Sequence, residues 1–127
     1  MPRKAARGRV LVVEDEALIA MMIEDLLADR GYRVAGPAAS LRAAIACISS
    51  GGLDFALLDV NLGAGATSFA LADALRTAGI PFAFITGYGP DGVRPDLRDV
   101  PVLTKPFDIA ALDDLLAELS ATAEKRV

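Results

Sequence analysis

Five polar residues with useful chemistry stand at the ends of short apolar stretches of the chain: Glu14, Asp15, Asp59, Thr86 and Lys105. Carboxylates that share one place repel each other unless a positive charge lies between them. Oxygen ligands without cysteine or histidine suit Mg²⁺, which often takes one or two carboxylates together with water and phosphate oxygens. A lysine ammonium group and a threonine hydroxyl can then hold phosphoryl oxygens. The set indicates phosphoryl transfer, with Asp59 as the nucleophile that would form an aspartyl phosphate.

These side chains can meet only if the apolar stretches are neighbouring strands of one sheet. Buried strands are predicted at residues 9–13, 32–36, 55–58, 80–86 and 100–104. Helical periodicity predicts helices around residues 18–27, 41–48, 69–75 and 109–119. Strands that alternate with helices favour a parallel sheet with helices on both faces, and right-handed crossovers bring the carboxyl ends of all strands to one edge. All five polar residues fall on that edge.

Each of these residues also has a purely structural explanation. Glu14 and Asp15 could serve the helix that follows them, with Asp15 as its N-cap. Thr86 could be a strand-end hydroxyl, and Lys105 a solvated lysine at a turn. The residues alone leave these alternatives open, although no P-loop, GxGxxG or nucleophile-elbow motif competes for the site.

The connection before the last strand departs from the regular alternation. After the glycine-rich turn at 87–92, only residues 93–100 precede the strand, and Pro95 interrupts them. One irregular turn fits there and a full helix does not. The expected fold is therefore α/β, a five-stranded parallel sheet with helices on both faces and a fourth helix that is short or missing.

The composition narrows the class of protein. The 127 residues suffice for one domain, expected at 9–121, with a basic tail at 1–8 and a polar tail at 122–127. A net charge of −4 argues against nucleic acid or an anionic membrane as a partner. The single cysteine, Cys47, excludes an internal disulfide, and no apolar run reaches the roughly 20 residues of a membrane span. The sequence has no histidine, which removes histidine-based catalysis. We expect a cytoplasmic domain.

The motifs together resemble those of response-regulator receiver domains. The resemblance covers about residues 8–121 and rests on four segments in the expected order: Val12-Val13-Glu14-Asp15-Glu16, Leu57-Leu58-Asp59, Thr86 and Leu103-Thr104-Lys105-Pro106-Phe107. It implies a flavodoxin-like sheet with strand order 2-1-3-4-5 and a role in two-component signalling. It also implies that Asp59 accepts a phosphoryl group from a sensor histidine kinase or a phosphotransfer protein.

The resemblance further implies a Mg²⁺ site. Asp15 and Asp59 would bind the ion directly, together with the backbone carbonyl of Asn61, and Glu14 would act through water. Asn61 also bears on an enzymatic alternative, a Mg²⁺-dependent phosphatase that acts on small molecules. Such enzymes usually carry a second acid two residues after the nucleophile, where this chain has Asn61, so this alternative is less favoured.

Phosphoryl-binding groups follow from the same resemblance. Thr86 and Lys105 would hold the phosphoryl oxygens, and the peptide bond between Lys105 and Pro106 is expected to be cis. We expect a stand-alone switch without an output domain, in which phosphorylation adds roughly 1.5 to 2 negative charges. A receiver-like adaptor that binds its partners regardless of phosphorylation is the other alternative.

The sequence departs from the family pattern at several places. Leu62-Gly63-Ala64-Gly65 replaces the Met-Pro turn that commonly follows the phosphoacceptor, and Val102 stands where the family carries its switch aromatic. The segment Phe84-Ile85-Thr86-Gly87-Tyr88 and the shortened helix are similar to a subgroup with a Phe-Ala-Thr-Gly-type motif, whose receivers tend to work with HWE and HisKA2 sensor kinases. Tyr88 is a candidate to gate water access to the acyl phosphate or to replace the aromatic switch.

Overall fold

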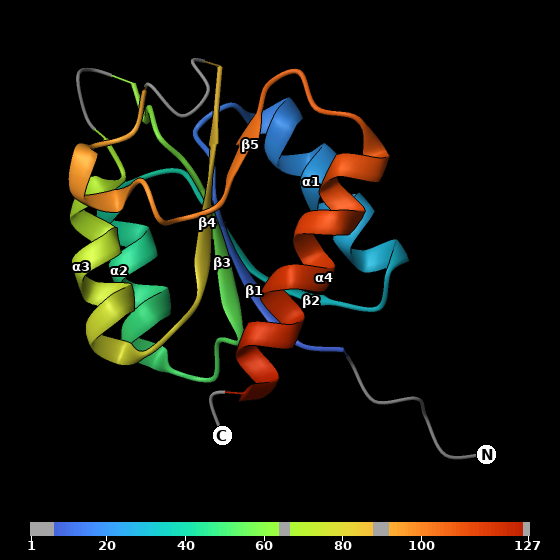
Figure 1. The fold of residues 1–127 in the computed structure, drawn as a ribbon, viewed down its shortest axis with the longest axis horizontal. Helices are drawn as coiled ribbons and strands as arrows, with labels where there is room; N and C mark the ends of the chain where they lie inside the picture. Colours follow the sequence, from blue (N-terminus) through green and yellow to red (C-terminus); the bar gives the residue numbers. More distant parts are fainter. Residues whose placement is uncertain (1–6, 64–66, 88–91, 126–127) are drawn as a thin grey trace.

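The candidate residues all lie at the side of the central sheet where the strands have their carboxyl ends. The computed structural model describes residues 7–63, 67–87 and 92–125. Five parallel strands follow the order β2-β1-β3-β4-β5 (Figure 1): β1 (Arg9–Val13), β2 (Arg33–Ala38), β3 (Phe55–Asp59), β4 (Phe82–Thr86) and β5 (Val102–Thr104). The predicted parallel sheet and its strand order are confirmed, and β3, which ends in Asp59, lies at the centre.

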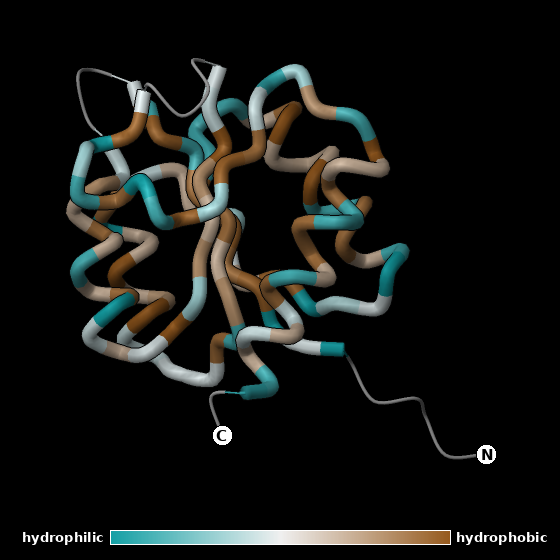
Figure 2. Tube along the Cα trace, viewed as in Figure 1, coloured by the Kyte–Doolittle hydropathy of each residue, from teal (hydrophilic) through white to brown (hydrophobic). Residues whose placement is uncertain are grey.

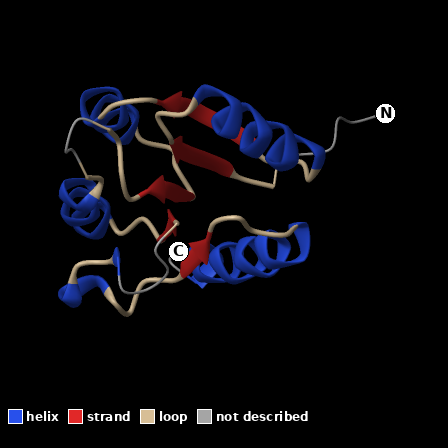
Figure 3. Ribbon diagram, turned by 90° about the horizontal axis from the view of Figure 1, so that it is seen from above, coloured by secondary structure: helices blue, strands red, loops and turns tan. Residues whose placement is uncertain are grey.

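In the part of the chain that the structure describes, four α-helices cover the two faces of the sheet. The helices α1 (Ala17–Asp29) and α4 (Ile109–Lys125) lie on one face, and α2 (Leu41–Ser50) and α3 (Phe69–Ala78) lie on the other (Figure 1 and Figure 3). The fold therefore has three layers, as the alternation of strands and helices predicts.

Successive strand residues point to opposite helix layers. Leu58 and Phe84 pack on the side of α2 and α3, whereas Leu57 and Ile85 pack on the side of α1 and α4. Every residue of β3 and β4 is buried, and the centre of the fold is correspondingly hydrophobic (Figure 2). Strands covered on both faces read as continuous apolar runs, which is why the sequence marked them clearly.

Among its described residues, the connection from β4 to β5 holds no α-helix but contains a turn of 3₁₀-helix, η2 (Pro95–Leu97). Val93, Leu97 and Val100 are buried against the α2 and α3 side of the sheet, where they cover the strands in place of a helix. The prediction of a short or missing helix between these strands is confirmed. The fourth α-helix in chain order is the C-terminal α4.

The ends of several elements lie beyond the predicted positions. The N–H of Arg7 donates to the Gly31 carbonyl at 3.0 Å, and the Gly8 carbonyl accepts from the N–H of Arg33 at 2.8 Å. Ordered backbone contacts thus begin before residue 9. β2 continues to Ala38. α4 continues to Lys125, past the expected end of the domain at 121, because alanine, glutamate and lysine are good helix formers.

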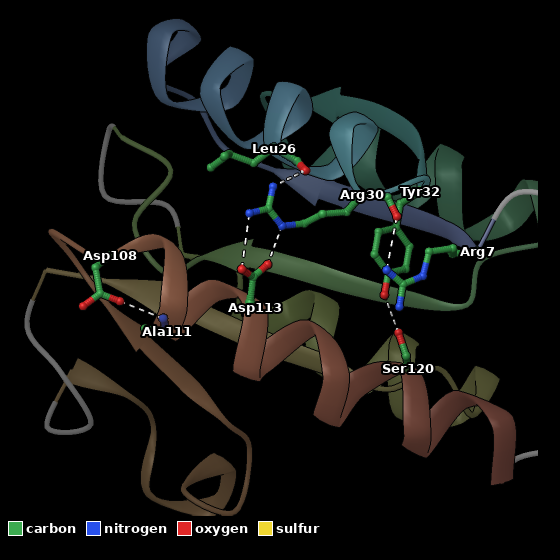
Figure 4. A network of polar contacts seen from close by, with 8 residues as sticks. All are labelled: Arg7, Leu26, Arg30, Tyr32, Asp108, Ala111, Asp113 and Ser120. Atoms are coloured by element: carbon green, nitrogen blue, oxygen red, sulfur yellow. Dashed lines mark hydrogen bonds and ion pairs between the residues drawn. The ribbon is translucent and has the colours of Figure 1, made fainter.

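Polar contacts join α1 to α4 (Figure 4). Arg30, just after α1, forms an ion pair with Asp113 of α4, in which two guanidinium nitrogens face the two carboxylate oxygens. The hydroxyl of Tyr32 lies 2.6 Å from Oγ of Ser120. The guanidinium of Arg7 lies over the Tyr32 ring, 5.2 Å from its centroid. Ion pairs this exposed contribute little stability, so the contacts chiefly orient the two helices.

The N-cap of α4 fixes the start of this helix shortly after Lys105. Asp108 Oδ1 accepts a hydrogen bond from the N–H of Ala111 at 2.7 Å (Figure 4). Replacing Asp108 with Ala is expected to lower the free energy of unfolding by about 1 kcal/mol, as measured by urea denaturation. Asp114→Ala, at an exposed site within the same helix, is the control and should change it by less than about 0.5 kcal/mol. Equal losses in the two variants would contradict the capping role.

Candidate functional site

The carboxyl ends of four neighbouring strands bring the five candidate residues together. Glu14 and Asp15 follow β1, Asp59 ends β3, Thr86 ends β4, and Lys105 follows β5. The parallel registers pair Asp59 with Ile85 and Thr86 with Thr104. The placement expected from the sequence is therefore the placement in the structure.

Three carboxylates form a cluster at this edge. Glu14, Asp15 and Asp59 each offer one oxygen, and these oxygens all lie within 4.8 Å of one another. Glu14 and Asp59 are buried, with 2% and 5% of their surfaces exposed, whereas Asp15 is exposed. The cluster thus opens to solvent on the side of Asp15. A set of oxygen donors that includes two buried acids fits a hard divalent cation such as Mg²⁺.

Lys105 supplies the positive charge of the cluster. Its Nζ lies 2.9 Å from Glu14 Oε1 and 3.3 Å from Asp59 Oδ2. Three carboxylates and one ammonium group leave two uncompensated negative charges if all four groups are ionised. This excess is what a divalent cation would neutralise. The alternative of a freely solvated lysine at a turn is wrong.

This environment shifts the pKa values of Glu14 and Lys105. Burial raises the pKa of Glu14, as does its hydrogen bond with Asp59, and these effects outweigh the hydrogen bonds from Lys105 and from the N–H of Glu16. Burial lowers the pKa of Lys105, but the hydrogen bond to Glu14 and the nearby charges of Asp59 and Glu14 outweigh it. The net shift of Lys105 is upward, so the ammonium form persists.

Backbone groups orient the two buried carboxylates. Asp59 Oδ1 accepts from the N–H of Asn61 at 3.3 Å, and Glu14 Oε2 accepts from the N–H of Glu16 at 3.2 Å. Asn61, whose carbonyl the resemblance assigns to the metal, therefore borders the cluster through its N–H. Thr86 is fully buried, and its carbonyl accepts from the N–H of Lys105 at 2.8 Å, which holds β4 beside the lysine.

Some expectations at this edge need correction or extension. Asp15 is not the N-cap of α1, because that position belongs to Glu16 and no side chain caps the helix. The bond between Lys105 and Pro106 is cis, as predicted, and a second cis bond precedes Pro37. Val102, at the switch-aromatic position, is half-buried and pairs with Phe84. Tyr88 lies outside the described residues.

The sequence did not indicate a site role for Gly63, in the turn after β3. This residue has φ +77°, and a side chain there would approach the Asp15 carboxylate closely. A glycine just after β3 is the only sequence signal, and glycine is common in turns for other reasons.

The burial of Glu14 leads to a prediction about stability without metal. A raised folded-state pKa means that the stability contributed by Glu14 is fully present below its unfolded pKa, and is lost as pH rises through the folded value. In metal-free buffer at pH 7, Glu14→Gln should therefore raise the melting temperature, by roughly 4 °C for each kcal/mol gained. The difference should vanish near pH 4. Glu118→Gln, exposed on α4, is the control, and a lower melting temperature for Glu14→Gln would contradict this account.

The fold and the edge cluster define a class of protein, the flavodoxin-like α/β domain with an acidic pocket at the carboxyl ends of its strands. The profile of the response regulator receiver domain matches residues 10–117. This chain is a member of the response regulator receiver domain family, whose domains serve two-component signalling.

Particular relatives are similar over most of the chain. The phyllosphere-induced regulator PhyR of Methylorubrum extorquens is 33% identical over 86% of this chain and 42% of its own length. The solution structure of SdrG from Sphingomonas melonis is 43% identical, with a TM-score of 0.80 over 92% of this chain and 98% of that one. The receiver domain of PhyR from Erythrobacter litoralis is 30% identical, with a TM-score of 0.78 over 91% of this chain and 90% of that one.

The matches differ in how much of the other protein they cover. The chain spans about half the length of the curated relatives it matches, 42% for PhyR and 54% for another regulator, whereas it spans nearly all of SdrG. Within the part of the chain that the structure describes, no helix has the length and apolar character to cross a membrane.

Proposed function

We propose that this chain is a phosphorylation-dependent switch of the cytoplasm in which Asp59 is the phosphoacceptor. The observation that carries the proposal is the contact of the buried Asp59 carboxylate with Lys105, at 3.3 Å, inside a cluster of three acids. The carboxyl ends of the strands are where open α/β sheets bind their ligands, so a phosphodonor would reach the carboxylate at the end of the central strand from this side. Glu14 also contacts Lys105, but Asp59 is the acid at the end of the central strand β3, and it combines this position with a cationic partner.

The reaction needs little from the protein beyond position and charge. An oxygen of Asp59 attacks the phosphorus of a phosphohistidine, the bond from phosphorus to the imidazole nitrogen breaks, and the nitrogen keeps the electron pair. Lys105 then exchanges part of its contact with Asp59 and Glu14 for the phosphoryl oxygens. Thr86, at the end of the adjacent strand, is the proposed hydroxyl donor to the same oxygens.

The proposed metal ligands are Asp15, Asp59 and the carbonyl of Asn61, with Glu14 acting through water. A bound Mg²⁺ would supply positive charge against the phosphoryl oxygens. Without it, the two uncompensated charges of the cluster repel an incoming phosphate, because like charges at short range in a partly buried site interact strongly. The side chains of this chain therefore bind and orient the reacting groups.

The proposed phosphodonor is a sensor histidine kinase of the HWE or HisKA2 class, or a phosphotransfer protein fed by one. Two features support this class. The segment Phe84 to Gly87 is similar to the Phe-Ala-Thr-Gly-type motif, and the described residues before β5 form a 3₁₀ turn, η2, and no α-helix. The similarity to SdrG and to PhyR receivers accompanies these features.

Phosphotransfer from a purified, autophosphorylated HisKA2 kinase tests this proposal. We expect transfer of label to the wild-type chain within seconds to minutes, none to Asp59→Asn, and loss of the label in alkali, because an acyl phosphate hydrolyses there. A conventional HisKA kinase is the control and should transfer more slowly. Equal rates from both kinases would contradict the proposed donor class, and label retained by Asp59→Asn would contradict the phosphoacceptor.

A further inference from the structure

Gly63, which follows β3, lies near Asp15, the exposed acid of the cluster. Gly63 has φ +77°, and a Cβ built on it would lie 3.0 Å from Asp15 Oδ2. Ordinary contacts of a Cβ atom begin at 3.4 Å, so an alanine here would displace the carboxylate or the turn by a few tenths of an ångström. Any side chain at position 63 would thus compete with the Asp15 carboxylate for the same space.

Asp15 lacks the contacts that hold the other two acids. Glu14 accepts from Lys105 and from the N–H of Glu16, and Asp59 accepts from Lys105 and from the N–H of Asn61. Among the residues that the structure describes, no hydrogen bond or ion pair holds the Asp15 carboxylate. A side chain at position 63 would therefore meet a carboxylate that no described hydrogen bond or ion pair holds in place.

We propose that Gly63 is a positioning residue for the metal site: with no side chain, it leaves free the space that the Asp15 carboxylate needs to stay within the cluster. The inference rests on the proposed function, since it concerns how the cluster holds a divalent cation. Mg²⁺ tolerates little displacement of its ligands, because it demands near-octahedral geometry at about 2.0–2.1 Å. Gly63 also accounts for part of the departure of the segment Leu62-Gly63-Ala64-Gly65 from the family's usual turn.

Gly79 provides a matched control for the backbone conformation. It has φ +73°, close to that of Gly63, but nothing lies within 4 Å of the position its Cβ would take. Both positions favour glycine for conformational reasons. Only at Gly63 would a methyl group also meet a candidate metal ligand.

The test compares Gly63→Ala and Gly79→Ala in the full chain. Amide shifts of Asp15, Asp59 and Asn61 in a Mg²⁺ titration by NMR give the affinity, and thermal unfolding in metal-free buffer gives the stability. We expect similar losses of melting temperature in the two variants, because both acquire a strained backbone. We expect Mg²⁺ affinity to fall about tenfold in Gly63→Ala, as for loss of other groups that orient metal ligands, and to stay at the wild-type value in Gly79→Ala.

Gly63→Asn separates strain from contact and serves if the alanine variant does not fold. Asparagine tolerates positive φ better than alanine but still carries a Cβ, so Mg²⁺ affinity should fall with a smaller loss of stability. Labelling by acetyl phosphate should recover the wild-type rate at saturating Mg²⁺, since only the positioning of Asp15 is impaired. Unchanged affinity in both Gly63 variants, or an equal loss in Gly79→Ala, would overturn the positioning role alone. A wild-type chain that shows no Mg²⁺-dependent shifts would overturn the metal site as well.

Discussion

Asp15→Asn is expected to lower the affinity of the chain for Mg²⁺ by at least about 100-fold. Loss of a group that only orients a metal ligand costs about 10- to 100-fold, and loss of a proposed direct ligand should cost no less than the larger value. The substitution keeps the size of the side chain and removes one of the three clustered charges. Lys105, which contacts Glu14 and Asp59 at 2.9 and 3.3 Å, would then compensate one of the two charges that remain. A divalent cation would find only one uncompensated negative charge instead of two. Calorimetric titration with Mg²⁺ measures the change.

Asp25→Asn is the matched control for this effect. Asp25 is exposed on α1, so its replacement removes the same formal charge from the chain without touching the cluster. Charges this far from the site are screened in physiological salt, and the affinity should stay within about twofold of wild type. An Asp15→Asn chain that binds Mg²⁺ as tightly as Asp25→Asn would show that the ion, if bound, lies elsewhere.

Phe84→Ala is expected to lower the free energy of unfolding by about 3–5 kcal/mol, a large share of the 5–15 kcal/mol typical of a domain. Phe84 is fully buried in β4. Its ring packs edge-on against Phe69 and Phe82, with centroids 5.6 and 5.7 Å apart. Alanine would leave a cavity beneath α3, and the neighbouring Val102 is too small to fill it. Urea unfolding gives the difference in free energy.

Phe84→Leu is the control for cavity size at this position. Leucine keeps most of the buried apolar volume, so it should cost less than half as much as alanine, since cost rises with the volume of the cavity left behind. A loss below about 1 kcal/mol for Phe84→Ala would mean that the site collapses around the smaller side chain. It would also contradict the view that Phe84 fills the interior beside the switch position.

The fold could be predicted from the sequence because the buried strands and the connection that lacks a helix both have clear sequence signals. Residues of β3 and β4 are buried on both faces, so they appear as uninterrupted apolar runs. Pro95 and the few residues before β5 excluded a helix in that connection. The ends of the elements were harder to predict. The mostly polar residues 122–125 were expected to lie beyond the domain, but they include good helix formers, and polarity alone does not end a helix.

The members of the site were predictable as residues but not as contacts. Acids and a lysine at successive strand ends must meet at one edge of a parallel sheet, which follows from topology. The ion pair of Lys105 with Glu14 depends on side-chain reach, and the approach of Gly63 to Asp15 depends on the path of a turn. Neither is encoded in spacing along the chain. The prediction of Asp15 as the N-cap of α1 was wrong for a related reason. The Asp15 side chain belongs to the acidic cluster, and Glu16 occupies the N-cap position.

The central claim is that Asp59 is the phosphoacceptor, and intact mass after incubation with acetyl phosphate and Mg²⁺ tests it most directly. The wild-type chain and Asp59→Ala are compared, with and without a chelator, and an autophosphorylated kinase serves as a second donor. The account predicts one phosphoryl increment in the wild type, dependent on Mg²⁺ and absent from Asp59→Ala. An increment that survives in Asp59→Ala, or none in the wild type with either donor, would contradict it and favour an adaptor that acts without phosphorylation.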